Sequence, residues 1–158
     1  MYNILFICYG NICRSPMAEM IFKDIVIQNN KRFLFHCESK ATSMEEFGND
    51  IYPKAKRTLE NHHIIVEKHM ATIVKKEDYS KYQYIICMDS RNYQDLLRIF
   101  GEDPEHKIKL LLSFTGEEEE IEDPWYTGRF EYVYNQIYEG CMGLFKVIAY
   151  SNWYNIRH

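Results

Sequence analysis

Residues 4–16, with the sequence ILFICYGNICRSP, constrain the fold of this chain more than any other segment. The apolar, β-prone run ends at Cys8, and five residues separate that cysteine from Arg14. Ser15 and Pro16 then indicate a helix start, because serine is a good N-cap and proline suits the first helical position. The segment therefore predicts a buried strand, a tight loop and a helix N-terminus in immediate succession.

A loop of this kind can hold an anion. Its backbone N–H groups can all point inward, the helix dipole adds positive potential, and Arg14 offers a planar fork that fits two phosphate oxygens. Gly10 can take backbone angles that a Cβ would forbid. An ordinary thiol is mostly protonated at neutral pH, so this field has to favour the thiolate of Cys8, and Ser15 is placed to donate a hydrogen bond to its sulfur. The alternative interpretation is a buried strand with a structural cysteine and a capped helix.

The rest of the chain alternates between strand-like and helix-like patterns. We expect one domain over residues 1–158, built as a three-layer α/β sandwich with a four-stranded parallel sheet and helices on both faces. Ligands of such sheets bind outside the carboxyl ends of the strands, where Cys8 sits and where the loop carrying Asp123 can reach. The expected strands are 3–8, 33–39, 84–88 and 108–114, the expected helices are 15–28, 53–61, 90–100 and 129–150, and 117–120 is an acidic turn.

Composition excludes several classes of function. The net charge of −4 and the lack of a basic stripe argue against a nucleic-acid partner. No apolar run is long enough to cross a bilayer and no signal-peptide pattern opens the chain, so we expect a cytoplasmic protein without membrane insertion. The six histidines show no metal-ligand spacing, which predicts no metal and no cofactor. Five cysteines without a disulfide framework suit a reducing compartment. We expect Cys37, Cys87 and Cys141 to be small buried hydrophobes.

Two motifs carry a resemblance to a known family. Residues 8–16, CYGNICRSP, resemble the signature of the low-molecular-weight protein tyrosine phosphatases, and residues 123–126, DPWY, resemble that family's late acid-loop motif. Other segments fall in the family's order along nearly the whole chain, namely Ser39, 41–43, 48–49, 76–78 and 86–89.

The resemblance implies a cysteine-dependent phosphatase acting through a phosphocysteine intermediate. Cys8 would be the nucleophile, Arg14 and the loop amides would bind phosphate, and Asp123 would be the general acid and then the general base. The neighbouring Glu122 is a carboxylate that could be confused with this acid, but the family match favours Asp123. The implied phosphate-binding residues are Tyr9, Gly10, Asn11, Ile12, Cys13, Arg14 and Ser15.

The same resemblance implies supporting residues and a substrate pocket. Asn11, Ser15, Ser39 and His69 would brace the loop by hydrogen bonds. Tyr9, Ile12, Glu45, Trp125 and Tyr126 would line the pocket, whose aromatic walls would favour a phenyl group. Ile12 favours phosphotyrosine, because the family's arginine phosphatases tend to carry threonine at that position. Two residues depart from the pattern: Glu45 stands where relatives often have an aromatic wall, and Lys40 replaces a small residue. Cys13 is expected to act as the redox partner of Cys8.

Two other functions fit the motifs less well. Arsenate reductases of the same fold carry a similar loop but need further resolving cysteines, whereas Cys87 stands alone here. A non-catalytic phosphate-binding module would be expected to lose Cys8 or Asp123, and both are present. The expected partners are tyrosine-phosphorylated proteins or peptides, with phosphate, vanadate or similar oxyanions as inhibitors, and the expected state is a monomer.

Overall fold

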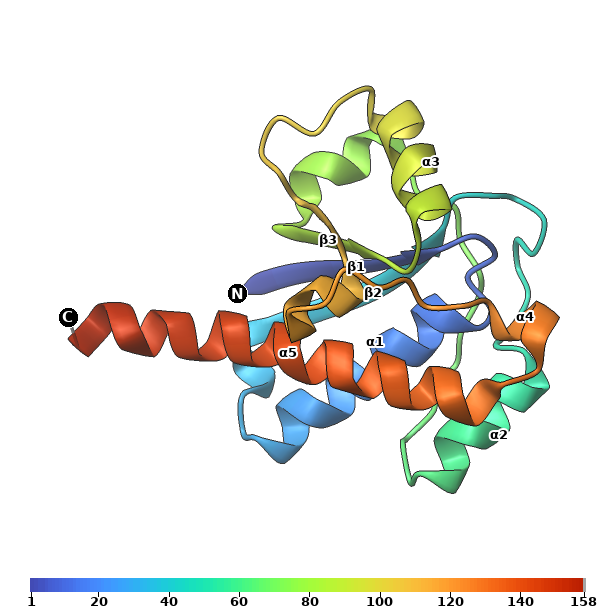
Figure 1. Cartoon of the computed structure of the whole chain (residues 1–158), viewed down its shortest axis with the longest axis horizontal. Coiled ribbons are helices and arrows are strands. Elements are labelled where there is room, and N and C mark those ends of the chain that lie inside the picture. Colours follow the sequence, from blue (N-terminus) through green and yellow to red (C-terminus); the bar gives the residue numbers. More distant parts are fainter. Residues whose placement is uncertain (158) are drawn as a thin grey trace.

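The computed structural model describes residues 1–157, with side chains described as far as Ser151. Four parallel strands form one sheet in the order β2-β1-β3-β4 (Figure 1). Their bounds are β1 Tyr2–Cys8, β2 Phe35–Ala41, β3 Tyr84–Cys87 and β4 Ile108–Leu110. The expected parallel α/β sandwich is confirmed, and the chain forms one domain.

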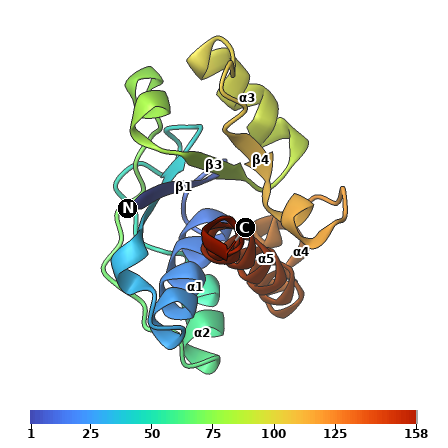
Figure 2. The same ribbon diagram turned by 90° about the vertical axis from the view of Figure 1, so that its left-hand side faces the viewer.

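Helices cover both faces of this sheet (Figures 1 and 2). One face carries α1 Arg14–Gln28, α2 Pro53–Asn61 and the long α5 Phe130–Arg157, and the other carries α3 Ser90–Phe100 with the 3₁₀ turn η2 Lys76–Lys81. The short α4, Pro124–Thr127, lies beyond the end of the sheet. No helix of the described residues is long and apolar enough to cross a membrane.

The side chains of the central strand β1 explain why helices cover both faces of the sheet. Along β1, Ile4 and Phe6 belong to the core beneath α1 and α5, whereas Leu5 and Ile7 belong to the smaller core beneath α3. All four side chains are fully buried. A strand that is apolar at every position from Ile4 to Cys8 fits between two helical layers, as parallel sheets require.

Two strands, β2 and β4, differ from their expected ranges by two residues or more. A 3₁₀ turn, η1 Arg32–Leu34, precedes β2, which starts at Phe35 and not at residue 33. The fourth strand ends at Leu110, and the rest of its apolar run forms a 3₁₀ helix, η3 Leu111–Thr115. An unbroken apolar run does not distinguish a strand from a buried helical turn.

Two glycines of α5 allow η3 to pack closely against that helix. A Cβ at Gly140 would lie 2.5 Å from the side chain of Leu111, and a Cβ at Gly143 would lie 2.4 Å from the carbonyl oxygen of Phe114. No larger residue fits at either position without a shift of η3.

The first helix also begins differently from its expected start. It starts at Arg14, with Cys13 in the N-cap position and no side-chain cap, so Ser15 and Pro16 lie within the first turn. Ser15 is therefore free for another role. The helix starts where the loop after β1 ends, which brings the loop, the helix N-terminus and the carboxyl edge of the sheet to one place (Figure 1).

Candidate active site

The loop between Cys8 and Arg14 turns its carbonyl oxygens outward. Four of these oxygens accept hydrogen bonds from residues outside the loop: Cys8 O from Thr42 N (3.1 Å), Tyr9 O from Ser43 N (3.1 Å), Asn11 O from His69 Nε2 (2.7 Å) and Ile12 O from Tyr52 N (2.9 Å). In a trans peptide the C=O and the following N–H point in opposite directions. The amides of residues 9, 10, 12 and 13 therefore point into the loop, which makes an anion cradle.

Asn11 fixes the shape of this cradle. It is fully buried and takes the left-handed conformation, with φ 61°, which asparagine tolerates better than most residues. Its side chain is held at both ends, since Oδ1 accepts from Thr72 N (3.1 Å) and Nδ2 donates to Ser15 Oγ (2.8 Å). The conformational freedom of Gly10 is not used here: Gly10 is not in the left-handed region, and a Cβ there would meet only ordinary contacts.

The sulfur of Cys8 lies at the floor of the cradle among hydrogen-bond donors. Ser15 Oγ is 3.0 Å from Sγ, and the backbone N–H groups of Asn11 and Ser15 approach it at 3.3 and 3.4 Å. Ser15 Oγ already accepts a hydrogen bond from Asn11, so its hydroxyl hydrogen is available for the sulfur. Donors gathered around one sulfur stabilise a thiolate.

Arg14 lies beside the cradle with its charge balanced by acids. Its side chain is 3% exposed, and NH1 donates to Asp89 Oδ2 (2.7 Å) and to the carbonyl of Ile121 (2.8 Å). NH2 lies 3.6 Å from Asp123 Oδ2. Burial opposes the charge, but the nearby Cys8, Asp89 and Asp123 outweigh it and raise the pKa of Arg14.

Arg14 keeps a buried donor for a ligand. Its Nε is buried and has no hydrogen-bond partner among the described residues. A buried donor of this kind is costly unless a ligand or water satisfies it, and a phosphate oxygen in the cradle would do so.

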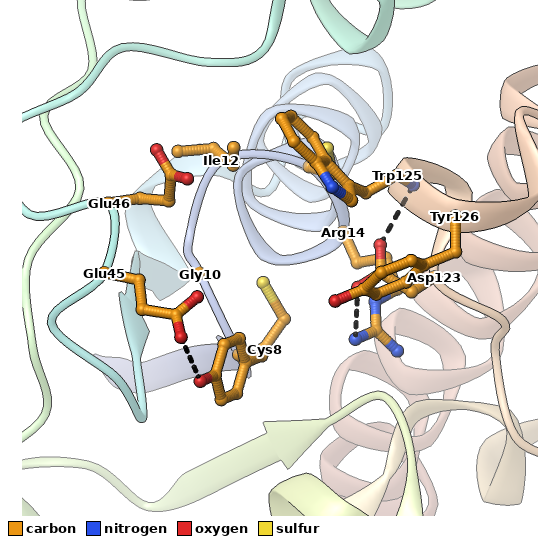
Figure 3. A pocket seen from close by; sticks show the side chains of 11 residues that line it. Cys8, Gly10, Ile12, Arg14, Glu45, Glu46, Asp123, Trp125 and Tyr126 are labelled. Atoms are coloured by element: carbon orange, nitrogen blue, oxygen red, sulfur yellow. Dashed lines mark hydrogen bonds and ion pairs between the residues drawn. The ribbon is translucent and has the colours of Figure 1, made fainter.

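Asp123 faces the cradle from the opposite loop (Figure 3). It caps α4, with Oδ1 accepting from Trp125 N (3.0 Å), while Oδ2 is directed toward Arg14. The adjacent Glu122 is engaged elsewhere, because it accepts from Arg129 Nε at 2.9 Å. Of these two neighbouring carboxylates, Asp123 is the one that lines the pocket.

The pocket above Cys8 has two different walls (Figure 3). One consists of Trp125 and Tyr126, which are 49% and 81% exposed, and Trp125 packs against Tyr52 with ring centroids 4.7 Å apart. The other wall is acidic and comes from the segment after β2, with the carboxylates of Glu45 and Glu46. Tyr9, Gly10, Ile12 and Cys13 complete the lining.

Comparison with known proteins agrees with this geometry. Residues 3–152 match the family model described as low molecular weight phosphotyrosine protein phosphatase. The chain belongs to this family. A rat protein named low molecular weight phosphotyrosine protein phosphatase is 37% identical over 144 residues, covering 88% of this chain and 90% of its own. It follows that the chain is a hydrolase of the protein tyrosine phosphatase type.

Solved structures give the same result for the fold. The crystal structure of YfkJ from Bacillus subtilis is similar to this phosphatase with a TM-score of 0.92 at 33% identity, covering 96% of each chain. The structure of an arginine phosphatase from Drosophila is also similar, with a TM-score of 0.83 at 30% identity, covering 92% of this chain and 96% of its own. The fold alone therefore does not decide which phosphorylated residue is the substrate.

The phosphatase family led us to expect four residues that brace the loop, and three of them contact it. Asn11, Ser15 and His69 make the hydrogen bonds described above. A carbonyl oxygen only accepts, so His69 must donate through Nε2. Ser39 is placed differently, since its hydroxyl donates to Glu19 Oε1 (2.6 Å) beneath α1 and not to the loop.

Lys40 also lies away from the pocket. Its ammonium binds the buried carboxylate of Asp78, with nitrogen–oxygen distances of 3.0 and 3.1 Å. Lys40 is directed to the opposite side of β2 from Ser39, because successive side chains of a strand alternate. It does not line the pocket with Glu45, so it cannot offset that charge at short range.

Sequence reasoning missed two residues of the phosphatase site. Asp89, which pairs with Arg14, also caps α3 by accepting from Asn92 N (2.8 Å). An acid directly after a buried strand and before a helix was the available signal, because that strand ends at the same edge of the sheet as Cys8. Glu46 also lines the pocket, but the family resemblance pointed only to the position of Glu45, and the sequence offers no separate signal for Glu46.

All five cysteines of the phosphatase are free and buried, and two of them, Cys8 and Cys13, line the pocket. Burial, and then the charge of Cys8, raise the pKa of the Cys13 thiol. Burial also raises the pKa values of Cys37, Cys87 and Cys141, which lie in the core as expected.

Proposed function

We propose that this protein hydrolyses phosphotyrosine in proteins or peptides, as well as small aryl phosphates, through a phosphocysteine intermediate. The observation that carries the proposal is the position of Cys8 Sγ, ringed by donors at 3.0 to 3.4 Å and facing Asp123 across the pocket. A nucleophile, an oxyanion cradle and a carboxyl group on one cavity are the parts that phosphoryl transfer needs.

In the first half of the reaction, phosphate oxygens accept hydrogen bonds from the amides of the cradle and from the free Nε of Arg14. The Cys8 thiolate attacks phosphorus, an S–P bond forms, and the bond from phosphorus to the phenolic oxygen breaks. Asp123, protonated, gives its proton to that oxygen, so the leaving group departs as a neutral phenol. Asp123 Oδ2 lies 3.6 Å from Arg14 NH2, which holds the carboxyl on the phosphate side of the pocket.

In the second half, the roles of the carboxyl group reverse. Asp123, now ionised, takes a proton from a water molecule as that water attacks phosphorus. The S–P bond breaks, inorganic phosphate leaves, and the sulfur returns to the thiolate state. The Ser15 hydroxyl, oriented by Asn11, donates to the sulfur as it regains its charge.

The alternatives fit these residues less well. A thiol-dependent arsenate reductase would need further resolving cysteines, spaced closely after the third strand, but Cys87 is fully buried in β3 and the next cysteine, Cys141, is buried in α5. A non-catalytic phosphate-binding module would have no need for the pairing of Cys8 with Asp123. For an arginine phosphatase, Ile12 offers an apolar side chain at the pocket wall, which suits a phenyl ring better than a guanidinium.

The test is hydrolysis of an aryl phosphate by the wild type and two variants. Cys8→Ser should abolish turnover and retain phosphate binding, because the cradle amides are unchanged. Asp123→Asn should slow turnover by roughly 10²–10⁴-fold, and the loss should shrink for leaving groups of low pKa, which need no proton. Turnover by Cys8→Ser within about tenfold of wild type, or faster hydrolysis of phosphoarginine than of phosphotyrosine peptides, would refute the proposal.

The proposal extends to the protein's surroundings. Phosphate, vanadate and similar oxyanions should occupy the cradle as competitive inhibitors. The five free thiols fit a reducing compartment such as the cytoplasm. We expect a monomer that acts without a metal or cofactor.

A further inference from the structure

The mouth of the pocket is acidic in a way that the proposed chemistry does not require. Eleven described residues line the pocket, and the cation among them, Arg14, lies buried at its floor. The segment 44–50, MEEFGND, contributes three carboxylates and no lysine or arginine. Two of those carboxylates, Glu45 and Glu46, line the pocket itself.

Both carboxylates are held in place. Glu45 Oε1 accepts from the Tyr9 hydroxyl at 2.7 Å, and Glu46 Oε2 accepts from Asn49 Nδ2 at 2.7 Å. A dashed line marks the hydrogen bond of Glu45 in Figure 3. The stem of Glu46 lies over the phosphate loop, because a Cβ on Gly10 would be 3.4 Å from its Cγ. Fixed carboxylates beside a dianion-binding loop repel negative charge without losing rotamer entropy on binding.

One neighbouring cation reduces this field but does not cancel it. The guanidinium of Arg91 lies over the ring of Tyr9, the partner of Glu45, 4.4 Å from its centroid. It does not line the pocket. One positive charge thus stands near two carboxylates, and the mouth remains acidic.

We propose that Glu45 and Glu46 make this enzyme prefer phosphotyrosine flanked by lysine or arginine over phosphotyrosine flanked by acids. The inference rests on the proposed function and adds the substrate class. A phosphotyrosine ring that enters between Trp125 and the acidic wall leaves its flanking residues at the rim. There a basic side chain of the peptide can pair with Glu45 or Glu46, because the single described hydrogen bond of each carboxylate uses only part of its acceptor capacity. An Asp or Glu of the peptide meets a like charge at the same place.

The test uses three phosphotyrosine peptides of equal length with Lys, Ala or Glu on both sides of the phosphotyrosine. Exposed charge pairs change binding modestly, about two- to fivefold each, so the wild type should favour the Lys peptide over the Glu peptide on the order of tenfold in kcat/KM. The difference should lie in KM and should shrink at high ionic strength.

Three variants test whether Glu45 and Glu46 cause the preference for the Lys peptide. Glu45→Gln with Glu46→Gln removes both charges and keeps the acceptors for Tyr9 and Asn49, so the ratio should fall to within about twofold of unity. Arg91→Gln removes the opposing charge and should raise the ratio. Glu102→Gln, on the exposed loop after α3 and at the opposite edge of the sheet, is the matched control and should leave the ratio unchanged.

Hydrolysis of a small aryl phosphate, measured in parallel, separates the two proposals. If no variant with intact Cys8 and Asp123 hydrolyses it, the proposed function fails. If it is hydrolysed but the Lys-to-Glu peptide ratio is the same in the double variant and in Glu102→Gln, the inference about the rim is overturned.

Discussion

The ion pair between Arg14 and Asp89 offers a test in which two roles of one carboxylate can be separated. Asp89 binds the guanidinium at 2.7 Å and also caps α3. Breaking a buried ion pair from one side costs about 3–5 kcal/mol. The Asp89 side chain is 23% exposed, so water can replace part of the contact, and we expect about 2–3 kcal/mol for the pair. Loss of an N-cap adds about 1 kcal/mol.

The contributions of the ion pair and of the helix cap predict the effects of three substitutions of Asp89. Asp89→Ala removes both roles and should lower the free energy of unfolding by about 3–4 kcal/mol, or roughly 6–15 °C in Tm for a chain of this size. Asp89→Ser keeps a capping oxygen and should regain about 1 kcal/mol. Asp89→Asn keeps the cap and a neutral acceptor for Arg14, so it should be the mildest of the three.

The assay is urea unfolding of each variant, with inhibition by inorganic phosphate measured in parallel. Asp89→Ala should also weaken phosphate binding, because Arg14 loses the contact that orients it. Glu102→Gln serves as the control for a surface charge. An unfolding free energy for Asp89→Ala within about 0.5 kcal/mol of wild type, the range of ordinary surface substitutions, would refute this reasoning.

Three further predictions concern other parts of the molecule. Peroxide should inactivate the enzyme reversibly, and Cys13→Ser should recover more poorly with thiols, whereas equal recovery would contradict a redox role for Cys13. Burial raises the pKa of Asp103, but hydrogen bonds from Tyr79 and two backbone amides outweigh this effect and lower the pKa overall. Asp103→Ala should therefore lower the free energy of unfolding at neutral pH. That deficit should disappear as pH falls through the lowered pKa, and a pH-independent difference in urea midpoint would be the contrary result. Chelators should leave turnover unchanged, and vanadate should compete with substrate; loss of activity on chelation would point to a metal.

Local sequence signals predicted the elements whose boundaries depend on local chemistry. Helix α2 begins at Pro53, which the sequence indicated as its first residue, and α3 spans residues 90–100 as expected, ending before Gly101. Strand β3 was predicted from its short apolar run to within one residue. In each case a residue with restricted backbone preferences stands at the boundary, or the run is too short for any other element.

Local sequence signals did not predict the structure where tertiary contacts compete with the conformational preference of a residue. Ser15 is a good N-cap by residue type, but its hydroxyl is used by Cys8 and Asn11 instead. Asn11, not Gly10, takes the left-handed conformation, because the contacts of its side chain stabilise that backbone. Asp89 meets Arg14 across 75 residues of sequence, so its position after a buried strand indicates the site but not its partner.

The site divides into a part that performs chemistry and a part that selects substrate, and the two have different origins in the fold. Cys8, Arg14 and the cradle amides are fixed by the end of β1 and the start of α1, where hydrogen bonds from outside the loop hold four of its carbonyl oxygens. The acidic wall comes from an exposed segment after β2 that is tied to the loop through side chains such as Glu45. Changes to that wall can therefore alter KM for peptides while the phosphoryl-transfer step, measured with small aryl phosphates, stays constant.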